Sequence, residues 1–249
     1  MTEPLLEVRD LCKSFGALHA SDAIRFDVRP GETHAVIGPN GAGKTTFISQ
    51  LAGNLRPDSG RITFAGEDIT ALPAPRRARK GLARSFQITS VFPEFTALEN
   101  VALAVQAQAG HSFRFWRDAR RDSALTGPAR KVLEQVGLQE RADVVAGNLA
   151  HGEHRQLEVA MALATRPRLL LLDEPMAGMG IEESQRMIAL LSSLKRRQTI
   201  ILVEHDMDAV FRLADRISVL VYGRVIATGA PEEVRLNPEV RAAYLGEDA

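Results

Sequence analysis

The chain has 249 residues, and its 31 lysines and arginines balance 31 aspartates and glutamates, so the formal net charge is zero. This balance argues against nucleic-acid binding through bulk positive charge. With 45% hydrophobic and 25% charged residues, the composition is that of a globular protein and excludes disordered, collagen-like and coiled-coil chains. The single cysteine, Cys12, cannot form an internal disulfide. No run approaches the ~20 apolar residues of a membrane helix, so we expect a cytosolic chain of one or two domains.

The first informative segment is a glycine-rich loop between a strand and a helix. A mostly apolar run predicts a buried strand at residues 34–37, and the helical pattern of Phe47, Ile48 and Leu51 follows the loop. A phosphate-binding P-loop requires this context. Glycines let backbone N–H groups point at phosphate oxygens, and the helix N-terminus adds partial positive charge. The predicted nucleotide contacts are Gly38, Pro39, Asn40, Gly41, Ala42, Gly43, Lys44, Thr45 and Thr46.

Four side chains, of Lys44, Thr45, Asp173 and Glu174, carry the predicted chemistry of this site. Lys44 is expected to hold the β- and γ-phosphates, and the Thr45 hydroxyl is expected to bind Mg²⁺. Four consecutive leucines at residues 169–172 predict a strand buried on both faces. At its carboxyl end, we expect Asp173 to reach the Mg²⁺ shell and Glu174 to take a proton from the attacking water.

With these motifs in place, the whole chain resembles the nucleotide-binding subunits of ATP-binding cassette (ABC) transporters. The resemblance implies an α/β fold: a P-loop NTPase core with an inserted α-helical subdomain and an N-terminal antiparallel β subdomain. It divides a single ATPase domain, residues 1–249, into a core at 1–86 and 151–249 and a helical subdomain at 87–150.

Three more residues take roles from the resemblance. Phe15 stands where the family has an aromatic ring that stacks on adenine, although an isolated aromatic is more often a half-buried strand residue. Gln87 matches the glutamine that couples Mg²⁺ and the attacking water to the membrane partner. His205 follows the β-rich residues 199–203 and matches the histidine that contacts the γ-phosphate, whereas a histidine after a strand is otherwise usually structural.

The signature segment departs from the family pattern Leu-Ser-Gly-Gly-Gln. Ala150 lacks the serine hydroxyl, whose hydrogen bond to a charged phosphate is worth about 1.5–3 kcal/mol. A helix N-terminus that attracts an anion remains, so either hydrolysis is slower there or backbone donors suffice. The loop at 176–180 also lacks the aspartate found in many members. The expected nucleotide contacts here are Leu149, Ala150, His151, Gly152 and Glu153.

Several segments resemble one branch of the family, the ATPases of branched-chain amino acid importers. They are the alanine of the signature and residues 155–158, 175–179, 204–207 and, most specifically, 237–246. The resemblance implies ATP and Mg²⁺ as cofactors, two transmembrane permeases, and a second ATPase that is either a different chain or a second copy. A solute-binding protein would act indirectly, and no nucleic acid is involved. The chain would lie peripherally on the cytoplasmic face of the inner membrane, and related systems carry urea, amides or other amino acids.

Three other functions are weighed against this one. An ATPase of lipopolysaccharide export is similar in length and core, but its signature usually keeps serine and paired glycines. A nucleotide-gated binding module with little turnover would explain the degenerate signature, but Glu174 and His205 speak against it. A chromosome-associated ABC ATPase would need a long coiled-coil insertion, and no heptad tract is present.

The remaining clusters are interpreted as structural. His151 and His154 lack acidic or thiol partners at the spacing of a zinc site. The basic, aromatic residues 111–121 are expected to form an amphipathic helix rather than a membrane or nucleic-acid contact. Helical spacing is predicted around Phe92, Phe95, Leu98 and Val101, and again around Lys131, Leu133, Val136 and Leu138. The solvated face of a short helix is predicted for Arg76, Arg77, Arg79, Lys80 and Arg84.

Overall fold

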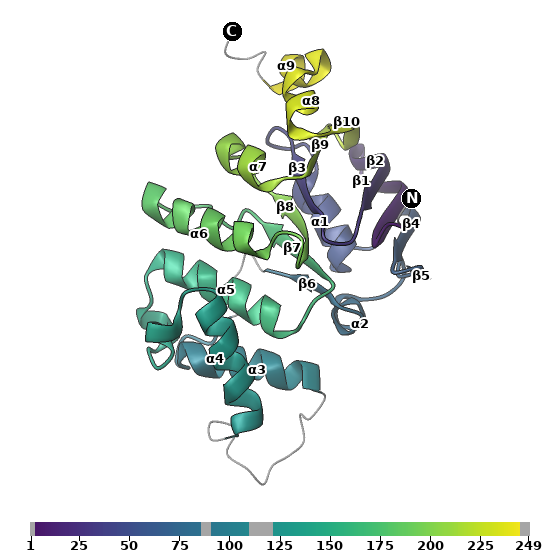
Figure 1. The fold of residues 1–249 in the computed structure, drawn as a ribbon. Helices are drawn as coiled ribbons and strands as arrows, with labels where there is room; N and C mark the ends of the chain where they lie inside the picture. The colour runs from purple at the N-terminus through teal and green to yellow at the C-terminus, as the bar shows by residue number, and fades with distance from the viewer. Residues whose placement is uncertain (1–2, 86–90, 110–121, 245–249) are drawn as a thin grey trace.

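A computed structural model describes residues 3–85, 91–109 and 122–244. Within these residues two sheets organise the chain (Figure 1). The antiparallel sheet has the order β2-β1-β4-β5 and is formed by β1 (Leu6–Phe15), β2 (Leu18–Val28), β4 (Ser59–Phe64) and β5 (Glu67–Asp68). The six-stranded sheet has the order β10-β9-β3-β8-β7-β6 and is formed by β3 (Thr33–Ile37), β6 (Leu82–Arg84), β7 (Leu169–Asp173), β8 (Thr199–Val203), β9 (Arg216–Val221) and β10 (Arg224–Gly229).

Neighbouring strands of the six-stranded sheet pair in parallel, except for β10, which is antiparallel to β9. Helices connect the parallel strands, as the right-handed crossovers of α/β proteins require. The predicted fold class is therefore confirmed, including the antiparallel β subdomain at the N-terminal side. The helices are α1 (Lys44–Ala52), α2 (Ala74–Arg79), α3 (Ala97–Ala109), α4 (Ser123–Gln135), α5 (His151–Ala164), α6 (Ile181–Leu194), α7 (Met207–Leu213), α8 (Pro231–Leu236) and α9 (Pro238–Tyr244).

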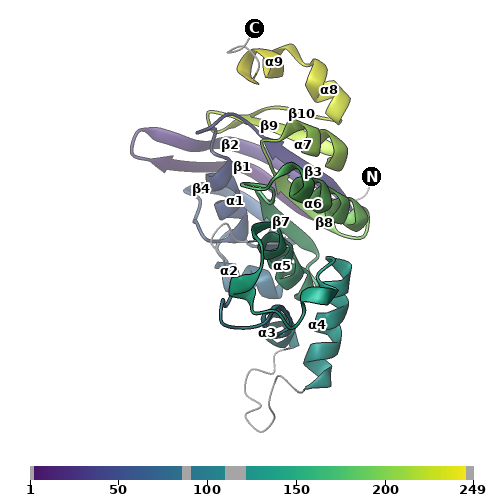
Figure 2. The same cartoon turned by 90° about the vertical axis from the view of Figure 1, so that its left-hand side faces the viewer.

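The six-stranded sheet is covered on both faces, as its continuous apolar strands predicted. Leu169 and Leu171 of β7 pack in one hydrophobic cluster with α1 and the antiparallel sheet. Leu170 and Leu172, which alternate with them, pack in another cluster with α5 and α6. Figures 1 and 2 show the same two layers on either side of the strands. Consequently α1 and α5 lie on opposite faces of the sheet.

The chain between β6 and β7 contributes α3 and α4, which pack together with α5. The start of α3 and the end of α4 differ from the sequence prediction. Thr96 and Glu99 cap the start of α3 reciprocally, with Thr96 N 2.8 Å from Glu99 Oε2 and Glu99 N 3.2 Å from Thr96 Oγ1, so Phe92 and Phe95 precede the helix. At its other end α4 stops at Gln135, and the buried Val136 and Leu138 follow it. Within the described ranges, no helix is both long and apolar enough to cross a membrane.

The predicted solvated position of Arg77 is wrong, because its side chain is only 1% exposed. Its guanidinium donates hydrogen bonds of 2.7–3.0 Å to four backbone carbonyls, those of Gln50, Leu51, Thr70 and Leu72. Two of these carbonyls, those of Gln50 and Leu51, belong to the last turn of α1, so Arg77 supplies donors to the end of this helix beside the Gly53 N–H that also reaches Gln50 O. Burial lowers the pKa of Arg77 to about 10.

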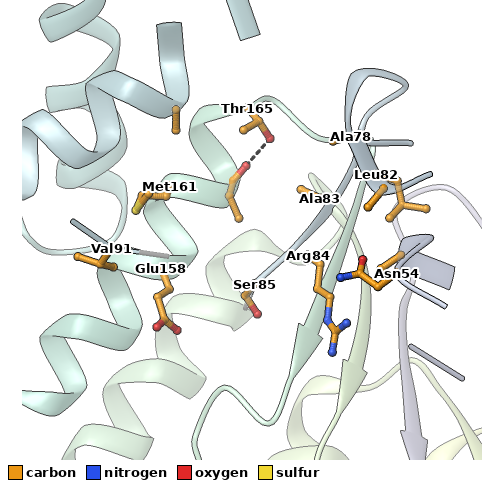
Figure 3. A pocket seen from close by; sticks show the side chains of 14 residues that line it. Asn54, Ala78, Leu82, Ala83, Arg84, Ser85, Val91, Glu158, Met161 and Thr165 are labelled. Carbon is orange, nitrogen blue, oxygen red and sulfur yellow. Dashed lines mark hydrogen bonds between the residues drawn. The ribbon is translucent and has the colours of Figure 1, made fainter. Parts of the chain in front are cut away.

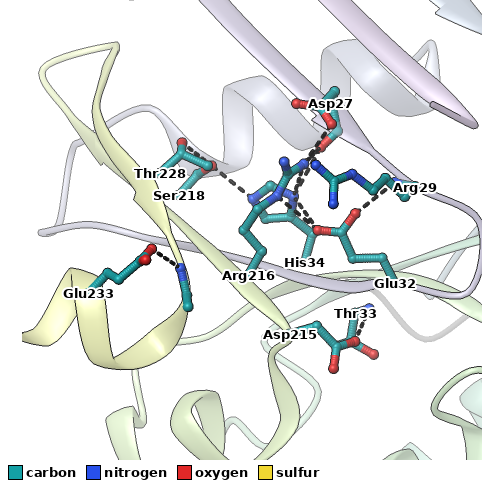
Figure 4. A network of polar contacts seen from close by, with 11 residues as sticks. Asp27, Arg29, Glu32, Thr33, His34, Asp215, Arg216, Ser218, Thr228 and Glu233 are labelled. Atoms are coloured by element: carbon teal, nitrogen blue, oxygen red, sulfur yellow. Dashed lines mark hydrogen bonds and ion pairs between the residues drawn. The ribbon is translucent and has the colours of Figure 1, made fainter. Parts of the chain in front are cut away.

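A polar network fixes the other end of the strand that leads into the P-loop (Figure 4). His34 of β3 is fully buried, with Nε2 2.8 Å from Ser218 Oγ and Nδ1 3.0 Å from Asp27 O. Arg216 Nη2 lies 3.3 Å from His34 Nδ1 and also pairs with Asp27. Burial, together with the positive charge of Arg216, lowers the pKa of His34 to about 3. A neutral imidazole therefore joins β3 to β9 and to the end of β2.

Candidate functional site

The predicted P-loop connects β3 to α1 and folds around the side chain of Lys44. Lys44 Nζ donates hydrogen bonds to Gly38 O at 2.6 Å and to Pro39 O at 3.1 Å, and the side chain is buried. Burial lowers the pKa of Lys44, whereas the negative charges of Glu174 and Asp173 act in the opposite direction. The structure thus brings the predicted lysine and both predicted carboxylates to one place.

Two glycines of this loop are required by close backbone contacts. A Cβ atom on Gly38 would lie 2.0 Å from Leu220 O, and one on Gly43 would lie 2.2 Å from Ala20 O. Gly43 also has a φ of 102°, which favours glycine. The loop is therefore wedged between the end of β9 and the hairpin of β1 and β2.

That hairpin carries Phe15, the residue predicted to stack on adenine. Phe15 ends β1 opposite Leu18, and its side chain is 51% exposed. Lys13 Nζ lies 5.5 Å from the centroid of the ring. The exposed ring stands on the hairpin that touches the P-loop through Ala20, so an aromatic base can reach it.

Asp173, the predicted Mg²⁺ ligand, ends β7 and forms an ion pair with Arg84. Arg84 Nη2 lies 2.8 Å from Asp173 Oδ2, and the two side chains are 11% and 2% exposed. Arg84 Nη1 also lies 3.3 Å from Ser49 Oγ of α1. The predicted solvent-facing position of Arg84 is wrong, because Arg84 belongs to β6, the strand paired with β7, and not to a surface helix.

Glu174, the predicted base, follows directly in an uncommon backbone conformation. Its φ is 50°, in the left-handed region, and its N–H donates to Val203 O of β8 at 2.9 Å. Non-glycine residues adopt this region infrequently and often at functional sites. The half-buried Glu174 is thereby held at the carboxyl end of the sheet, where ligands of α/β proteins bind.

Glu204 also belongs to this region, although it is not among the site residues predicted from the sequence. This carboxylate is almost fully buried and accepts hydrogen bonds from Met176 N at 3.0 Å and from His205 N at 3.1 Å. Burial raises the pKa of Glu204, and these hydrogen bonds oppose the rise. The side chain of His205 is 63% exposed. Glu204 therefore ties the loop after Glu174 to the backbone of the predicted γ-phosphate contact.

The signature segment forms the start of α5, as predicted. Ala150 precedes the helix, and its N–H donates to Glu153 Oε2 at 3.0 Å, while Arg141 Nε lies 2.7 Å from Glu153 Oε1. His151 Nε2 lies 3.2 Å from Ala177 O. The two segments that depart from the family pattern, 149–153 and 176–180, are thus in contact with each other. Since α5 and α1 cover opposite faces of the sheet, the sheet separates the signature segment from the P-loop.

Comparison with known proteins settles the family. Residues 21–177, more than half of the chain, match the ABC transporter family, and residues 224–249 match the family described as branched-chain amino acid ATP-binding cassette transporter. The chain belongs to the ABC transporter family. It is an ATP-binding subunit of a transporter, and it hydrolyses ATP.

Its relatives match this ABC ATPase over nearly the whole length. The high-affinity branched-chain amino acid transport ATP-binding protein BraF of Pseudomonas aeruginosa is 41% identical over 99% of this chain and 100% of its own. The corresponding protein LivG of Escherichia coli is 39% identical with the same coverage. Among solved structures, the ADP conformation of the ABC transporter cassette MJ1267 is 29% identical, with a TM-score of 0.85 over 98% of this chain and 100% of that one.

Some predictions for this ABC ATPase stay open. Gln87 and the segment 111–121 lie outside the described residues. The structure describes the other predicted site residues. The P-loop, Asp173, Glu174 and His205 gather at the carboxyl ends of β3, β7 and β8, whereas residues 149–153 lie at the start of α5. Arg84 and Glu204 were not predicted as site residues. The one signal in the sequence is their position: Glu204 directly precedes His205, and Arg84 stands three residues before Gln87.

Proposed function

We propose that this ATPase powers an importer of branched-chain amino acids from the cytoplasmic face of the plasma membrane. The observation that carries the proposal is the match of residues 224–249 to the branched-chain family, at the end of a chain whose curated relatives carry that transport in their names. The amino acid itself would not contact this chain, which would supply the energy.

We propose that Lys44 binds the β- and γ-phosphates of ATP, with Phe15 against the adenine. The ammonium group already points into the loop, where the carbonyls of Gly38 and Pro39 hold it. The negative charges of Glu174 and Asp173 oppose the lowering of the Lys44 pKa by burial. A nucleotide would add the N–H groups of the loop and of the first turn of α1 as phosphate donors.

The donor set also fits Mg²⁺. Thr45 supplies a hydroxyl oxygen and Asp173 a carboxylate oxygen, with Gln87 as the third predicted ligand, and oxygen ligands are those that Mg²⁺ prefers. When bound, the ion would neutralise phosphate charge. The buried Asp173 pairs with the cationic Arg84, and this pairing supports a role for the carboxylate beside a positive charge.

For hydrolysis, Glu174 would accept a proton from the attacking water, and His205 would stabilise charge on the γ-phosphoryl group. The signature segment that completes each site would come from a second ATPase, either a different chain or a second copy. The placement of α1 and α5 on opposite faces of one sheet supports this arrangement, because a single chain presents the two segments in different places.

A permease would contact the ATPase at a groove lined by Ser85 and Val91, the described residues on either side of the segment that contains Gln87 in the sequence. A cavity of about 230 Å³ opens between the core and helices α3 and α5 (Figure 3). Small and apolar side chains form most of its wall, and the buried carboxylate of Glu158 is the acidic group in it. Such a wall fits the apolar face of a short permease helix. The lining includes Ala52, Ala74, Ala78, Leu82, Val91 and Met161.

Uptake measured in the native host tests the proposal. We expect that deleting this chain abolishes high-affinity uptake of radiolabelled leucine, isoleucine and valine, and that the wild-type chain restores it but Lys44→Ala does not. A tagged chain extracted in mild detergent should co-purify with two permeases and a second ATPase. Unchanged uptake of all three amino acids, or co-purification with an envelope-lipid export complex, would contradict the importer.

A further inference from the structure

One carboxylate, that of Glu183, joins the start of α5 to the start of α6. Glu183 Oε1 accepts a hydrogen bond from Gly152 N at 3.1 Å, and Oε2 accepts one from Gly180 N at 3.2 Å. A Cβ atom on residue 152 would lie 2.7 Å from Glu183 Oε1, so Gly152 allows this approach. Glu183 therefore does more than cap its own helix: it takes a donor from the signature segment.

The contact lies within a larger connection between α5 and the loop 176–180. His151 Nε2 lies 3.2 Å from Ala177 O, and a Cβ atom on Gly178 would lie 3.2 Å from the same histidine nitrogen. α6 follows this loop directly in the chain, and Glu183 is its third residue. The side chains of His151 and Glu183 thus hold the loop against the start of α5 from two positions.

Two carboxylates bind the start of α5, the segment expected to meet a phosphate. Glu153 occupies the N–H of Ala150, and Glu183 occupies the N–H of Gly152. Arg141 pairs with Glu153, whereas in the described part of the chain Glu183 has hydrogen bonds to backbone N–H groups but no ion pair. Two of the donors that this helix start would offer to an anion, the N–H groups of Ala150 and Gly152, are thus bound by the chain's own carboxylates.

We propose that Glu183 competes with the γ-phosphate for the Gly152 N–H and thereby sets the ATP concentration at which two ATPase subunits close. The proposal rests on the proposed function, in which a nucleotide bound to the opposing subunit meets this segment. One N–H cannot donate fully to both groups, and the carboxylate and the phosphate repel each other. Glu183 is a positioning residue, because it acts through Gly152 and does not contact the reacting atoms.

The experiment compares two neighbouring glutamates in the assembled transporter. Glu183→Gln removes the charge and keeps one acceptor, so the half-saturating ATP concentration for hydrolysis should fall about 3–10-fold, with the saturated rate within about twofold of wild type. Glu182→Gln, one residue earlier and exposed, is the matched control and should leave the half-saturating concentration unchanged. An unchanged or higher half-saturating concentration in Glu183→Gln overturns the proposal.

A second readout does not depend on turnover. In a Glu174→Gln background, ATP-driven closure followed by fluorescence between labelled ATPase subunits should occur at about 3–10-fold lower ATP when Glu183→Gln is added. Equal closure curves with and without Glu183→Gln also overturn the proposal. This readout stays valid if Glu183→Gln slows hydrolysis by weakening the fold. Failure of leucine uptake would instead contradict the importer and leave these ATP measurements valid, so the two conclusions fail separately.

Discussion

The carboxylate of Asp173 lies 2.8 Å from the guanidinium of Arg84, and both groups are largely buried. β6 and β7 are neighbours in parallel register, with Arg84 opposite Leu171, and this pairing places the arginine beside the carboxylate. Arg84 also precedes the predicted glutamine Gln87 by three residues. Arg84, on the strand that precedes Gln87 in the sequence, therefore pairs with the same carboxylate, that of Asp173, that we propose as a ligand of Mg²⁺.

Removing Arg84 should lower the free energy of unfolding, and MgATP should restore part of this loss. Arg84→Ala leaves Asp173 buried without its ionic partner, a change that typically costs about 3–5 kcal/mol. We expect a loss of free energy of unfolding of this order, and a larger stabilisation by MgATP than in wild type. Urea unfolding with and without MgATP measures both, with ATP in EDTA as the control. Equal stabilisation of the two proteins by MgATP would show that Arg84 and Mg²⁺ do not act on the same carboxylate.

Lys44→Ala should abolish nucleotide binding. The ammonium group is buried in the loop at 2.6 Å from Gly38 O, and its removal deletes the main cationic contact predicted for the phosphates. Titration calorimetry with ATP should show no measurable binding, and Lys80→Ala, which removes a lysine paired with Glu67 at the surface, should bind normally. Unchanged affinity in Lys44→Ala would contradict the site.

Glu174→Gln should retain ATP and accumulate as a closed pair of ATPase subunits. The substitution removes the proton acceptor but preserves the side-chain length, and the backbone hydrogen bond to Val203 O is unaffected. Sedimentation of the complex with ATP should show a stable closed form and a rate of hydrolysis lowered by about 100-fold or more. Hydrolysis near the wild-type rate would exclude Glu174 as the base.

The sequence was sufficient where a motif coincides with a local pattern. The strand before the P-loop, α1 after it and the four leucines of β7 are each defined by neighbouring residues, so periodicity and glycine spacing predicted them. The buried face of α6 follows the same rule, because Met187, Leu190, Leu191 and Leu194 are spaced three and four residues apart, as on one side of a helix. For these elements, local sequence and tertiary packing favour the same structure.

The missed residues act through contacts between distant segments. Arg77 and Arg84 belong to a basic run whose sequence looks the same whether a guanidinium meets water, the carbonyls of α1 or a carboxylate on β7. Similarly, Glu183 and Glu204 stand in acidic, turn-like surroundings, and the backbone N–H groups that they bind lie 31 and 28 residues away in the chain. Only the packing of strands and helices shows which of these charges are structural.

His34 should make the stability of the protein depend on pH in mildly acidic solution. Its pKa is about 3 in the folded protein and near 6.5 in an unfolded chain, so between these values the unfolded state binds more protons. The free energy of unfolding should therefore fall as the pH is lowered from 7. The contribution of His34 to this fall is about 1 kcal/mol between pH 7 and 5.5.

A neutral substitution isolates this contribution from those of other groups. His34→Gln cannot take up a proton, so the difference in free energy of unfolding between wild type and this variant should shrink by about 1 kcal/mol when the pH falls from 7 to 5.5. Urea unfolding at a series of pH values measures it. Parallel curves for wild type and His34→Gln would mean that the buried imidazole becomes charged in the folded protein despite Arg216.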